Sequence, residues 1–245
     1  MNSLLTERDA AVLTLTINRP ERRNALDTAT YDALAAQLRA ADADTGLAAV
    51  ILTGAGDHFT AGNDLRDFQA ERPAGDSPAL RFLRALVDTD VPVLAAVEGH
   101  AVGVGVTLLQ HCDFAFAAGT ARLRMPFVAL GLCPEGASSL LLPRLAGMRK
   151  AAEWLLQGRA FDAAEAHAAG LLTGVTEPGQ ALAAARAVAA DLAAQPRQAL
   201  RVSKRMLRQA DRAAIHATLD HEAEQFRERL RSPEAQQAFA RFFNK

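Results

Sequence analysis

Short apolar runs alternate with amphipathic segments along the first half of the chain. Residues 11–18 alternate between leucine or isoleucine on one face and threonine on the other, which predicts a half-buried strand that ends before Pro20. Nearly continuous apolar runs are typical of strands buried in a parallel sheet, and they occur at 48–54, 91–99 and 113–118. This alternation of strands and helices predicts an α/β core with parallel strands.

Capping residues mark where the intervening helices begin. Asp27 precedes an amphipathic segment that continues to about Asp42. Ser77–Pro78 combines a capping side chain with a proline suited to the first turn, which predicts a second helix to about Asp88. A third helix is expected at 103–112, where it opens from a glycine-rich turn.

The second half of the chain is expected to be mostly helical. From about residue 134, alanine-rich and leucine-rich segments are separated by glycine and proline. The pattern changes again near residue 190, so we divide the chain into an α/β core at 1–190 and a C-terminal helical region at 191–245. One basic helix face in that region, which we interpret as solvated surface, comprises Arg197, Arg201, Lys204, Arg205 and Arg208.

Composition and charge argue against several classes of protein. The chain has 27 basic and 28 acidic residues and a formal net charge of −1, whereas binding of nucleic acid or an anionic membrane by bulk charge needs a more basic chain. A run of about 20 apolar residues, as a membrane span requires, is absent, and the N-terminus lacks the pattern of a secretory signal. Cys112 and Cys133 lack the spacing of a metal site and are too few for a disulfide scaffold, so we expect a reduced, cytoplasmic protein without a metal.

Two glycine-bearing junctions are candidates for an anion site. In FTAGNDL (59–65), Gly62 occupies a tight bend after a strand, and a helix is expected to begin near Asp64. The segment GHAVGVGVTLL (99–109) repeats this arrangement, although Leu108 stands where a dinucleotide fingerprint needs its third glycine. Such junctions leave backbone N–H groups unpaired and directed outward, which suits an anion or a developing oxyanion. Each junction taken alone is also typical of a plain turn.

Four sequence blocks occur in a fixed order along nearly the whole chain. They are INRPERRNAL (17–26), FTAGNDL (59–65), GHAVGVG (99–105) followed by CDFAFA, and LGLCPEGASSLLLPRLAG (130–147). Together they resemble the enoyl-CoA hydratase/isomerase family, also called the crotonase family. The resemblance implies an α/β, crotonase-like (ClpP/crotonase) core of repeated ββα units with a helical C-terminal trimerisation region, in a homotrimer or a dimer of trimers. It further implies an acyl-CoA thioester substrate and no metal or redox cofactor.

The resemblance also assigns an oxyanion hole to two backbone N–H groups, those of Asn63 and Val104. Fixed N–H dipoles stabilise the enolate oxygen that forms when a proton is removed beside a thioester carbonyl. Many relatives carry glycine where this chain has Val104, but a backbone donor does not require glycine. The residues expected to contact the substrate or its coenzyme A part are Ala61, Gly62, Asn63, Asp64, Leu65 and Arg22.

Glu135 is the candidate base. Family hydratases use two glutamates, and ungapped alignment places Thr107 and Phe127 at those positions, where neither side chain can move a proton as a carboxylate does. The context PEGASS resembles the Δ3,Δ2-enoyl-CoA isomerase branch, in which this glutamate takes a proton from C2 and returns it to C4. From its position alone, Glu135 is also typical of a first-turn acid that favours a helix dipole. We expect it in an apolar cleft with Phe127 and Leu132, with a raised pKa.

The leading hypothesis is therefore an isomerase that converts a 3-enoyl-CoA to a 2-enoyl-CoA in fatty-acid or related degradation. Two alternatives stay open: an enoyl-CoA hydratase with atypical catalytic residues, and a non-catalytic acyl-CoA-binding homologue.

Overall fold

The computed structural model describes residues 2–68 and 75–243. Its main element is a six-stranded sheet with strand order β1-β2-β3-β4-β6-β9. The first two strands pair antiparallel, and the other pairs are parallel. The strands are β1 (Leu4–Asp9), β2 (Val12–Ile17), β3 (Ala49–Gly54), β4 (Val93–Val97), β6 (Phe114–Ala118) and β9 (Gly174–Thr176). The four strands expected from the apolar pattern are confirmed.

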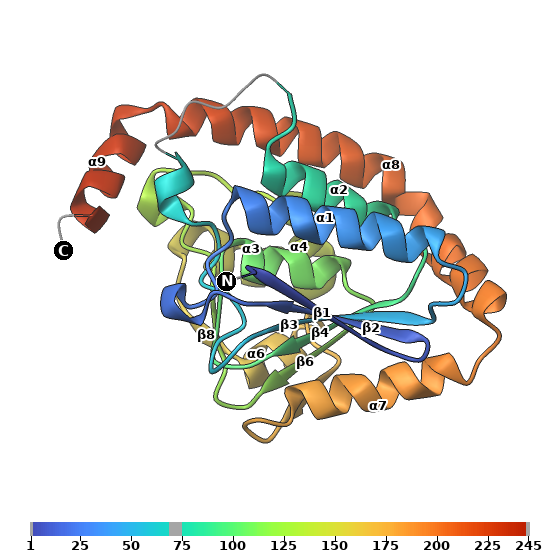
Figure 1. Ribbon diagram of the computed structural model, residues 1–245. Coiled ribbons are helices and arrows are strands. Elements are labelled where there is room, and N and C mark those ends of the chain that lie inside the picture. The colour runs from blue at the N-terminus through green and yellow to red at the C-terminus, as the bar shows by residue number, and fades with distance from the viewer. Residues whose placement is uncertain (1, 69–74, 244–245) are drawn as a thin grey trace.

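Helices cover both faces of this sheet (Figure 1). Helices α1 (Thr28–Ala43) and α2 (Pro78–Asp88) lie on one face and begin as predicted, because Asp27 accepts a hydrogen bond from Thr30 N and Ser77 accepts one from Leu80 N. On the opposite face, α7 (Ala181–Ala193) packs small alanines against β3, β4 and β6. The result is a three-layer arrangement with an apolar core on each side of the sheet.

A second, three-stranded sheet with order β5-β7-β8 stands beside the first. Its strands are β5 (His100–Val102), β7 (Arg122–Arg124) and β8 (Phe161–Asp162). Strands β4 and β5 lead into α3 (Val104–Thr107), and β6 and β7 lead towards α4 (Ser138–Ala146), so each unit contributes one strand to each sheet before its helix. These are the expected ββα units. The predicted helix at 103–112 consists of α3 followed by the 3-10 helix η3 (Leu108–His111).

The remaining elements are short helical turns and the C-terminal helices. The short elements are η1 (Pro20–Arg22), η2 (Leu65–Phe68), η4 (Val128–Leu130), α5 (Met148–Ala152), the π-helical turn η5 (Glu153–Gln157) and α6 (Ala163–Ala168). The C-terminal helices are α8 (Arg197–Leu230) and α9 (Pro233–Phe243). Residue 190 lies inside α7, which belongs to the sheet layers, and α8 begins seven residues later. The division into two regions stays a prediction.

Helix α8 differs from the solvated helix expected there. Lys204 is only 5% exposed, and its Nζ donates to Val91 O at 2.7 Å and pairs with Asp113 at 2.7 Å. Arg201 is 8% exposed and donates to the backbone oxygens of Asp42 and Asp44 at the end of α1. The interpretation of this basic face as solvated surface is therefore wrong for both residues, because backbone carbonyls and a carboxylate replace water around their charges.

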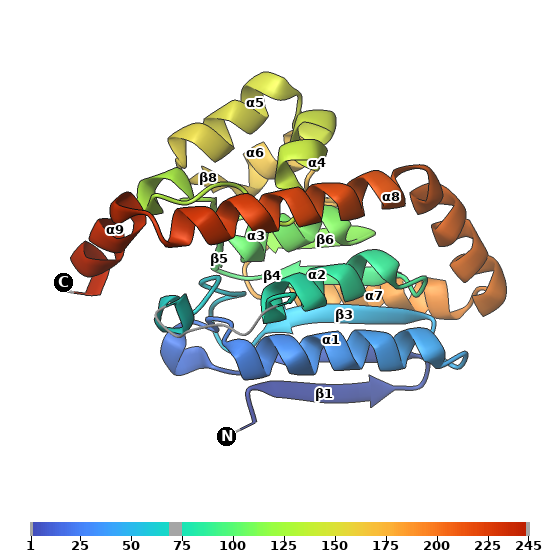
Figure 2. The ribbon, with the colours of Figure 1, turned by 90° about the horizontal axis from the view of Figure 1, so that it is seen from above.

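Helix α8 also packs against the main hydrophobic core. Ile215 and Leu219 are buried in the main core, and α8 contacts α2 and α4 (Figure 2). At its far end, α9 packs Ala235 and Phe239 near η4. Both C-terminal helices therefore pack against the body of the chain. No helix within residues 2–68 and 75–243 is long and apolar enough to cross a membrane.

Candidate active site

The two glycine-bearing junctions lie side by side. Thr60 N donates to His100 O at 3.0 Å, and Val102 N donates to Thr60 O at 3.0 Å, so the two segments run parallel. At Gly62, where φ is +85°, a Cβ atom would lie 2.5 Å from Val102 O. Both the positive φ and the close approach require glycine. Because the two segments run parallel, the residues that follow Gly62 and Gly103 lie at the same end of the pair.

Asn63 and Val104 are the next residues after these junctions. Leu26 N donates to Gly62 O at 2.8 Å and Leu26 O accepts from Asp64 N at 2.9 Å, so the N–H of Asn63 points away from Leu26. Val104 is the first residue of α3, where an N–H has no acceptor within the helix. Neither N–H donates a hydrogen bond within the part of the chain that the structure describes. Their role as an oxyanion hole stays a prediction.

Side chains from distant elements hold the first junction in place. Tyr31, buried on α1, donates its hydroxyl to Asn63 Oδ1 at 2.6 Å. Asp64 pairs with Arg19 at 3.3 Å and with Arg66 at 3.2 Å. Burial raises the pKa of Asp64, but the hydrogen bonds from Arg66 and Arg19 outweigh burial and hold that pKa below its usual value. Asp64 is therefore an ionised anchor of the loop.

The other residues expected to bind the substrate surround this loop. Ala61 N donates to Arg23 O at 2.9 Å, and Leu65 opens η2 and packs against the core. Arg22 is exposed at the end of η1, in the segment that Ala61 contacts. A cavity of about 10 Å³ lies next to these residues and is lined by Leu26, Thr28, Tyr31, Asn63, Asp64, Asp67, Pro78 and Ala79. Their contact with coenzyme A stays a prediction.

Glu135 is a buried carboxylate between α3 and α4. It is 9% exposed, and Thr107 Oγ1 donates to Glu135 Oε1 at 2.6 Å. Burial raises the pKa of Glu135 from 4.5 to about 7, the hydrogen bond from Thr107 lowers it, and the nearby charge of Glu222 raises it. A carboxyl with this pKa exchanges a proton readily near neutral pH.

Helix α3 connects this carboxyl to the second junction. Val104 opens the helix and Thr107 closes it, which separates them by about 4.5 Å along the helix axis. The aromatic ring of Phe127 is buried beside the junction, 3.9 Å from where a Cβ of Gly103 would lie. Leu132 is also buried, and its N–H donates to Phe127 O at 2.9 Å. Glu135 thus contacts the last residue of the helix that Val104 opens, although it does not line the cavity beside Asn63.

The backbone next to Glu135 is held by η3. Gln110 Nε2 donates to Gly136 O at 2.6 Å, and His111 Nε2 lies 2.7 Å from the same oxygen. Burial lowers the pKa of His111 to about 4, so the ring is neutral and its Nε2 carries the hydrogen. A Cβ at Gly136 would lie 2.8 Å from Thr107 Oγ1, which explains the glycine beside the base.

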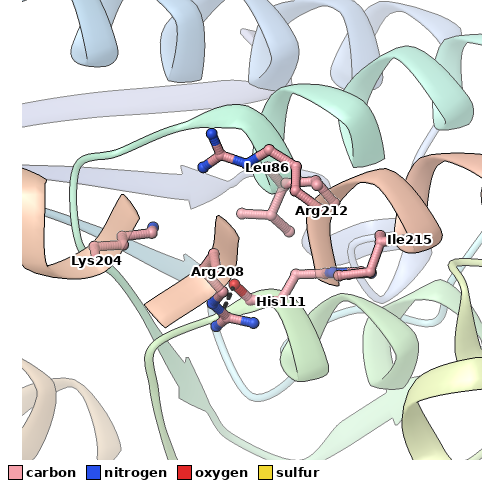
Figure 3. A pocket seen from close by; sticks show the side chains of 7 residues that line it. Leu86, His111, Lys204, Arg208, Arg212 and Ile215 are labelled. Carbon is pink, nitrogen blue, oxygen red and sulfur yellow. Dashed lines mark hydrogen bonds between the residues drawn. The ribbon is translucent and has the colours of Figure 1, made fainter. Parts of the chain in front are cut away.

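A second small cavity, of about 10 Å³, lies beneath α8 and not at these junctions (Figure 3). It is lined by Leu86, Val87, His111, Lys204, Arg208, Arg212 and Ile215. Arg208 donates to the backbone oxygens of His111 and Cys112 at 3.3 and 3.1 Å, so its charge stabilises the end of η3. The cavity is part of the attachment of α8 to the core.

Sequence reasoning missed the residues that anchor the site. Tyr31 lies on a helix whose other buried positions are apolar or small, and Arg19 lies three residues before Arg22, which is expected to contact the substrate. Glu222, described below, lies in a charged stretch of α8 with no local feature that sets it apart. The nearest sequence signal for Arg19 was the RPERR segment (19–23). It contains several arginines, and the pattern does not show which of them anchors the site.

Comparison with known proteins identifies the family. Residues 7–245 match the family described as enoyl-CoA hydratase/isomerase. The chain belongs to this family. A solved structure of an enoyl-CoA hydratase/isomerase from Pseudoalteromonas atlantica T6c has a TM-score of 0.94 and 42% sequence identity, covering 99% of this chain and 97% of that one. The observed α/β architecture with a C-terminal helical region is therefore the crotonase fold.

Named relatives fall into more than one reaction class. Enoyl-CoA delta isomerase 2 of Homo sapiens is 33% identical over 251 residues, covering 99% of this chain, and the chain spans 64% of that protein. A probable enoyl-CoA hydratase of Mycobacterium bovis is 31% identical over 246 residues, covering 99% of this chain and 95% of that protein. The family is shown, and the choice of reaction depends on the chemistry of the site.

Proposed function

We propose that this protein converts a 3-enoyl-CoA thioester to the 2-enoyl-CoA isomer, with Glu135 as its acid–base group. The observation that carries the proposal is a buried carboxyl with a pKa of about 7, which accepts a hydrogen bond from Thr107 at the end of the short helix that Val104 opens. A general base is most effective when its pKa lies near the working pH. The isomerase among the named relatives supports the same reaction.

The proposed reaction needs one carboxylate and one oxyanion site. The thioester oxygen accepts hydrogen bonds from Asn63 N and Val104 N, and the Glu135 carboxylate takes a proton from C2. The electron pair of that C–H bond forms the C1–C2 double bond of an enolate, whose oxygen charge the two N–H groups stabilise. Glu135 then gives the proton to C4, and the double bond moves from C3–C4 to C2–C3. Isomerisation leaves the overall oxidation state unchanged, so we propose that no redox cofactor takes part.

Hydration is the second candidate, and the site chemistry disfavours it. An enoyl-CoA hydratase must activate a water molecule and also protonate carbon, for which family hydratases use two glutamates. Here the corresponding positions carry the hydroxyl of Thr107 and the ring of Phe127. The other buried carboxylate nearby, Glu222, accepts hydrogen bonds from the backbone of α4 and is occupied by them.

A paired assay tests the proposal. Purified protein is given a 3-enoyl-CoA and, separately, a 2-enoyl-CoA of the same chain length, and formation or loss of the conjugated thioester is followed by its absorbance. Glu135→Gln keeps the shape of the side chain and removes the base, so isomerisation is expected to fall by about 10²-fold or more while acyl-CoA binding is retained. The matched control is Glu224→Gln, at an exposed position, which should keep wild-type activity.

Three outcomes contradict the proposal. Isomerisation at the wild-type rate by Glu135→Gln means that Glu135 is only a helix-end acid. Faster hydration than isomerisation by the wild type assigns the protein to the hydratases. Binding of acyl-CoA without either reaction identifies a non-catalytic homologue.

We further propose that the protein forms a homotrimer or a dimer of trimers. Large apolar side chains are exposed on α8, where Met206 is 70% and Leu207 is 82% exposed, and on the α5–η5 segment, where Met148 is 70% and Leu156 is 65% exposed. Exposed apolar groups of this size are typical of contact surfaces. Light scattering is expected to give three or six times the chain mass, and a monomer at micromolar concentration would contradict this.

A further inference from the structure

Glu222 of α8 lies buried against the segment that follows Glu135. It is 5% exposed, and its carboxylate accepts hydrogen bonds from Ala137 N at 2.6 Å, Ser139 N at 2.9 Å and Ser139 Oγ at 2.5 Å. The partners lie 83 to 85 residues away in sequence. One carboxylate on the C-terminal helix thus binds three donors beside the candidate base.

These hydrogen bonds supply a cap that α4 does not have within its own segment. Ala137 stands at the N-cap position, makes no side-chain cap, and has a φ of +58° in the left-handed region. A residue with a Cβ is strained there and needs support from its surroundings. The carboxylate of Glu222 satisfies the free N–H groups at the start of α4 and also complements the helix dipole.

The same segment carries Glu135, two residues before Ala137. On its other side, Gln110 and His111 fix the carbonyl of Gly136, as described above. The backbone that carries the candidate base is therefore held from two directions, by η3 and by α8. The hold from α8 is made by Glu222.

We propose that Glu222 is a positioning residue for Glu135: from α8 it fixes residues 137–139, which directly follow the segment that carries Glu135. This inference rests on the proposed function in taking Glu135 as the base. It adds a residue of the C-terminal helix to the machinery of the reaction. Since the contacts of Glu222 are with the start of α4, its effect on the reaction passes through Glu135.

Two other ionisable groups beside this segment, His111 and the thiol of Cys133, are neutral at neutral pH. Burial lowers the pKa of His111 to about 4, and burial raises the pKa of the Cys133 thiol to about 11. The pKa of Glu222 lies above its usual value, because burial raises it. The hydrogen bonds from Ser139 and Ala137 and the charge of His221 lower that pKa by less. When Glu222 is ionised it raises the pKa of Glu135, so its removal is expected to lower that pKa.

The test compares Glu222→Gln, Glu222→Asp and the exposed control Glu224→Gln. We expect Glu222→Gln to lower kcat for isomerisation by about tenfold or more, because a small displacement of a catalytic group is costly. The KM is expected to stay within about twofold, since Glu222 is not among the residues expected to contact acyl-CoA. The acid limb of the kcat/KM profile, which reports the base in the free enzyme, should move to lower pH.

Glu222→Asp keeps the charge, so the acid limb should stay at its wild-type position and kcat should recover in part. Glu224→Gln removes a charge from the same helix and should change neither quantity. A Glu222→Gln enzyme with wild-type kcat and an unmoved acid limb overturns the inference. So does an equal effect of Glu224→Gln.

A direct titration separates this inference from the proposed function. Carbon-13 NMR of labelled glutamate carboxyls, with Glu135 assigned from the Glu135→Gln spectrum, measures the pKa of Glu135 without any turnover. If the wild type fails to isomerise but Glu222→Gln still lowers that pKa, the proposed function fails and the link between the two carboxyls stands. If the wild type isomerises and the pKa does not move, the inference about Glu222 fails alone.

Ser139→Ala decides the matter if Glu222→Gln does not fold. It removes one donor to Glu222 from an exposed position and leaves both carboxylates in place. We expect a severalfold fall in kcat at unchanged KM. A wild-type kcat would overturn the inference.

Discussion

Replacing Glu135 by glutamine should stabilise the protein, and only at neutral to alkaline pH. The pKa of Glu135 is about 7 in the folded chain and 4.5 without burial, so the folded state binds this proton more tightly than the unfolded state. The stability contributed by that proton is fully present below pH 4.5 and is lost as the pH rises through about 7. With about 1.4 kcal/mol for each tenfold change in proton affinity, ionised Glu135 costs about 3 kcal/mol above pH 7.

Glutamine avoids most of this cost. Its side-chain oxygen still accepts from Thr107 Oγ1, while an unpaired amide N–H costs about 1 kcal/mol. The net gain in the free energy of unfolding is therefore about 2 kcal/mol at pH 8, and it should vanish near pH 5. For a chain of this length, 2 kcal/mol corresponds to a rise in Tm of about 4–8 °C.

Urea denaturation and thermal melts of wild type and Glu135→Gln at pH 5, 6.5 and 8, at one protein concentration, measure the difference. The exposed control Glu224→Gln should show no gain that grows with pH. A Glu135→Gln protein that is no more stable than wild type at pH 8 would refute the reasoning. A gain that is the same at all three pH values would show that it does not come from the proton on Glu135.

Two further substitutions test the junctions and the attachment of α8. Val104→Pro removes one N–H at a helix position that tolerates proline, so kcat should fall by about 10²-fold. The circular dichroism spectrum should stay unchanged. An unchanged kcat would exclude this N–H from the oxyanion hole. Lys204→Met removes the buried partner of Asp113 and Val91 O and should lower the free energy of unfolding by about 3 kcal/mol in urea denaturation, whereas a solvated lysine would cost almost nothing.

The elements that the sequence predicted correctly are those with a local cause. Asp27 and Ser77 accept hydrogen bonds from residues three positions ahead, so the beginning of each helix is encoded within one turn. The buried strands carry continuous apolar runs because helices cover both faces of the sheet. Strand β1 (Leu4–Asp9) was missed because only Leu4 is buried, which leaves no alternation to detect. Strands β8 and β9 have two and three residues, too few for any periodic signal.

The residues of the candidate site also fall into those with a local sequence signal and those without one. Gly62 and the glycine-rich turn before Val104 are visible in the sequence, because a close approach of two backbones demands glycine at fixed places. The resemblance to the family then suggested Glu135. By contrast, Tyr31 reaches Asn63 across 32 residues and Glu222 reaches Ala137 across 85. A tyrosine in a core and a glutamate on a charged helix have ordinary local surroundings, so no pattern distinguishes them from residues without such partners.

Helix α8 shows why charge patterns mislead at this point. Arg201 and Lys204 occupy a basic face that is typical of solvated surface. Both are nevertheless buried, because backbone carbonyls at the end of α1 and just before β4 accept their hydrogen bonds. Carbonyls at the end of a helix such as α1 carry partial negative charge. Backbone carbonyls occur in every sequence, so the residue types do not predict these contacts. These two contacts attach the first half of α8, and Glu222 attaches the second half to the segment that carries Glu135. Helix α8, which looks strongly polar in the sequence, therefore holds the segment that buries Glu135. Burial raises the pKa of this carboxyl to about 7, and keeping it ionised costs about 3 kcal/mol at neutral pH.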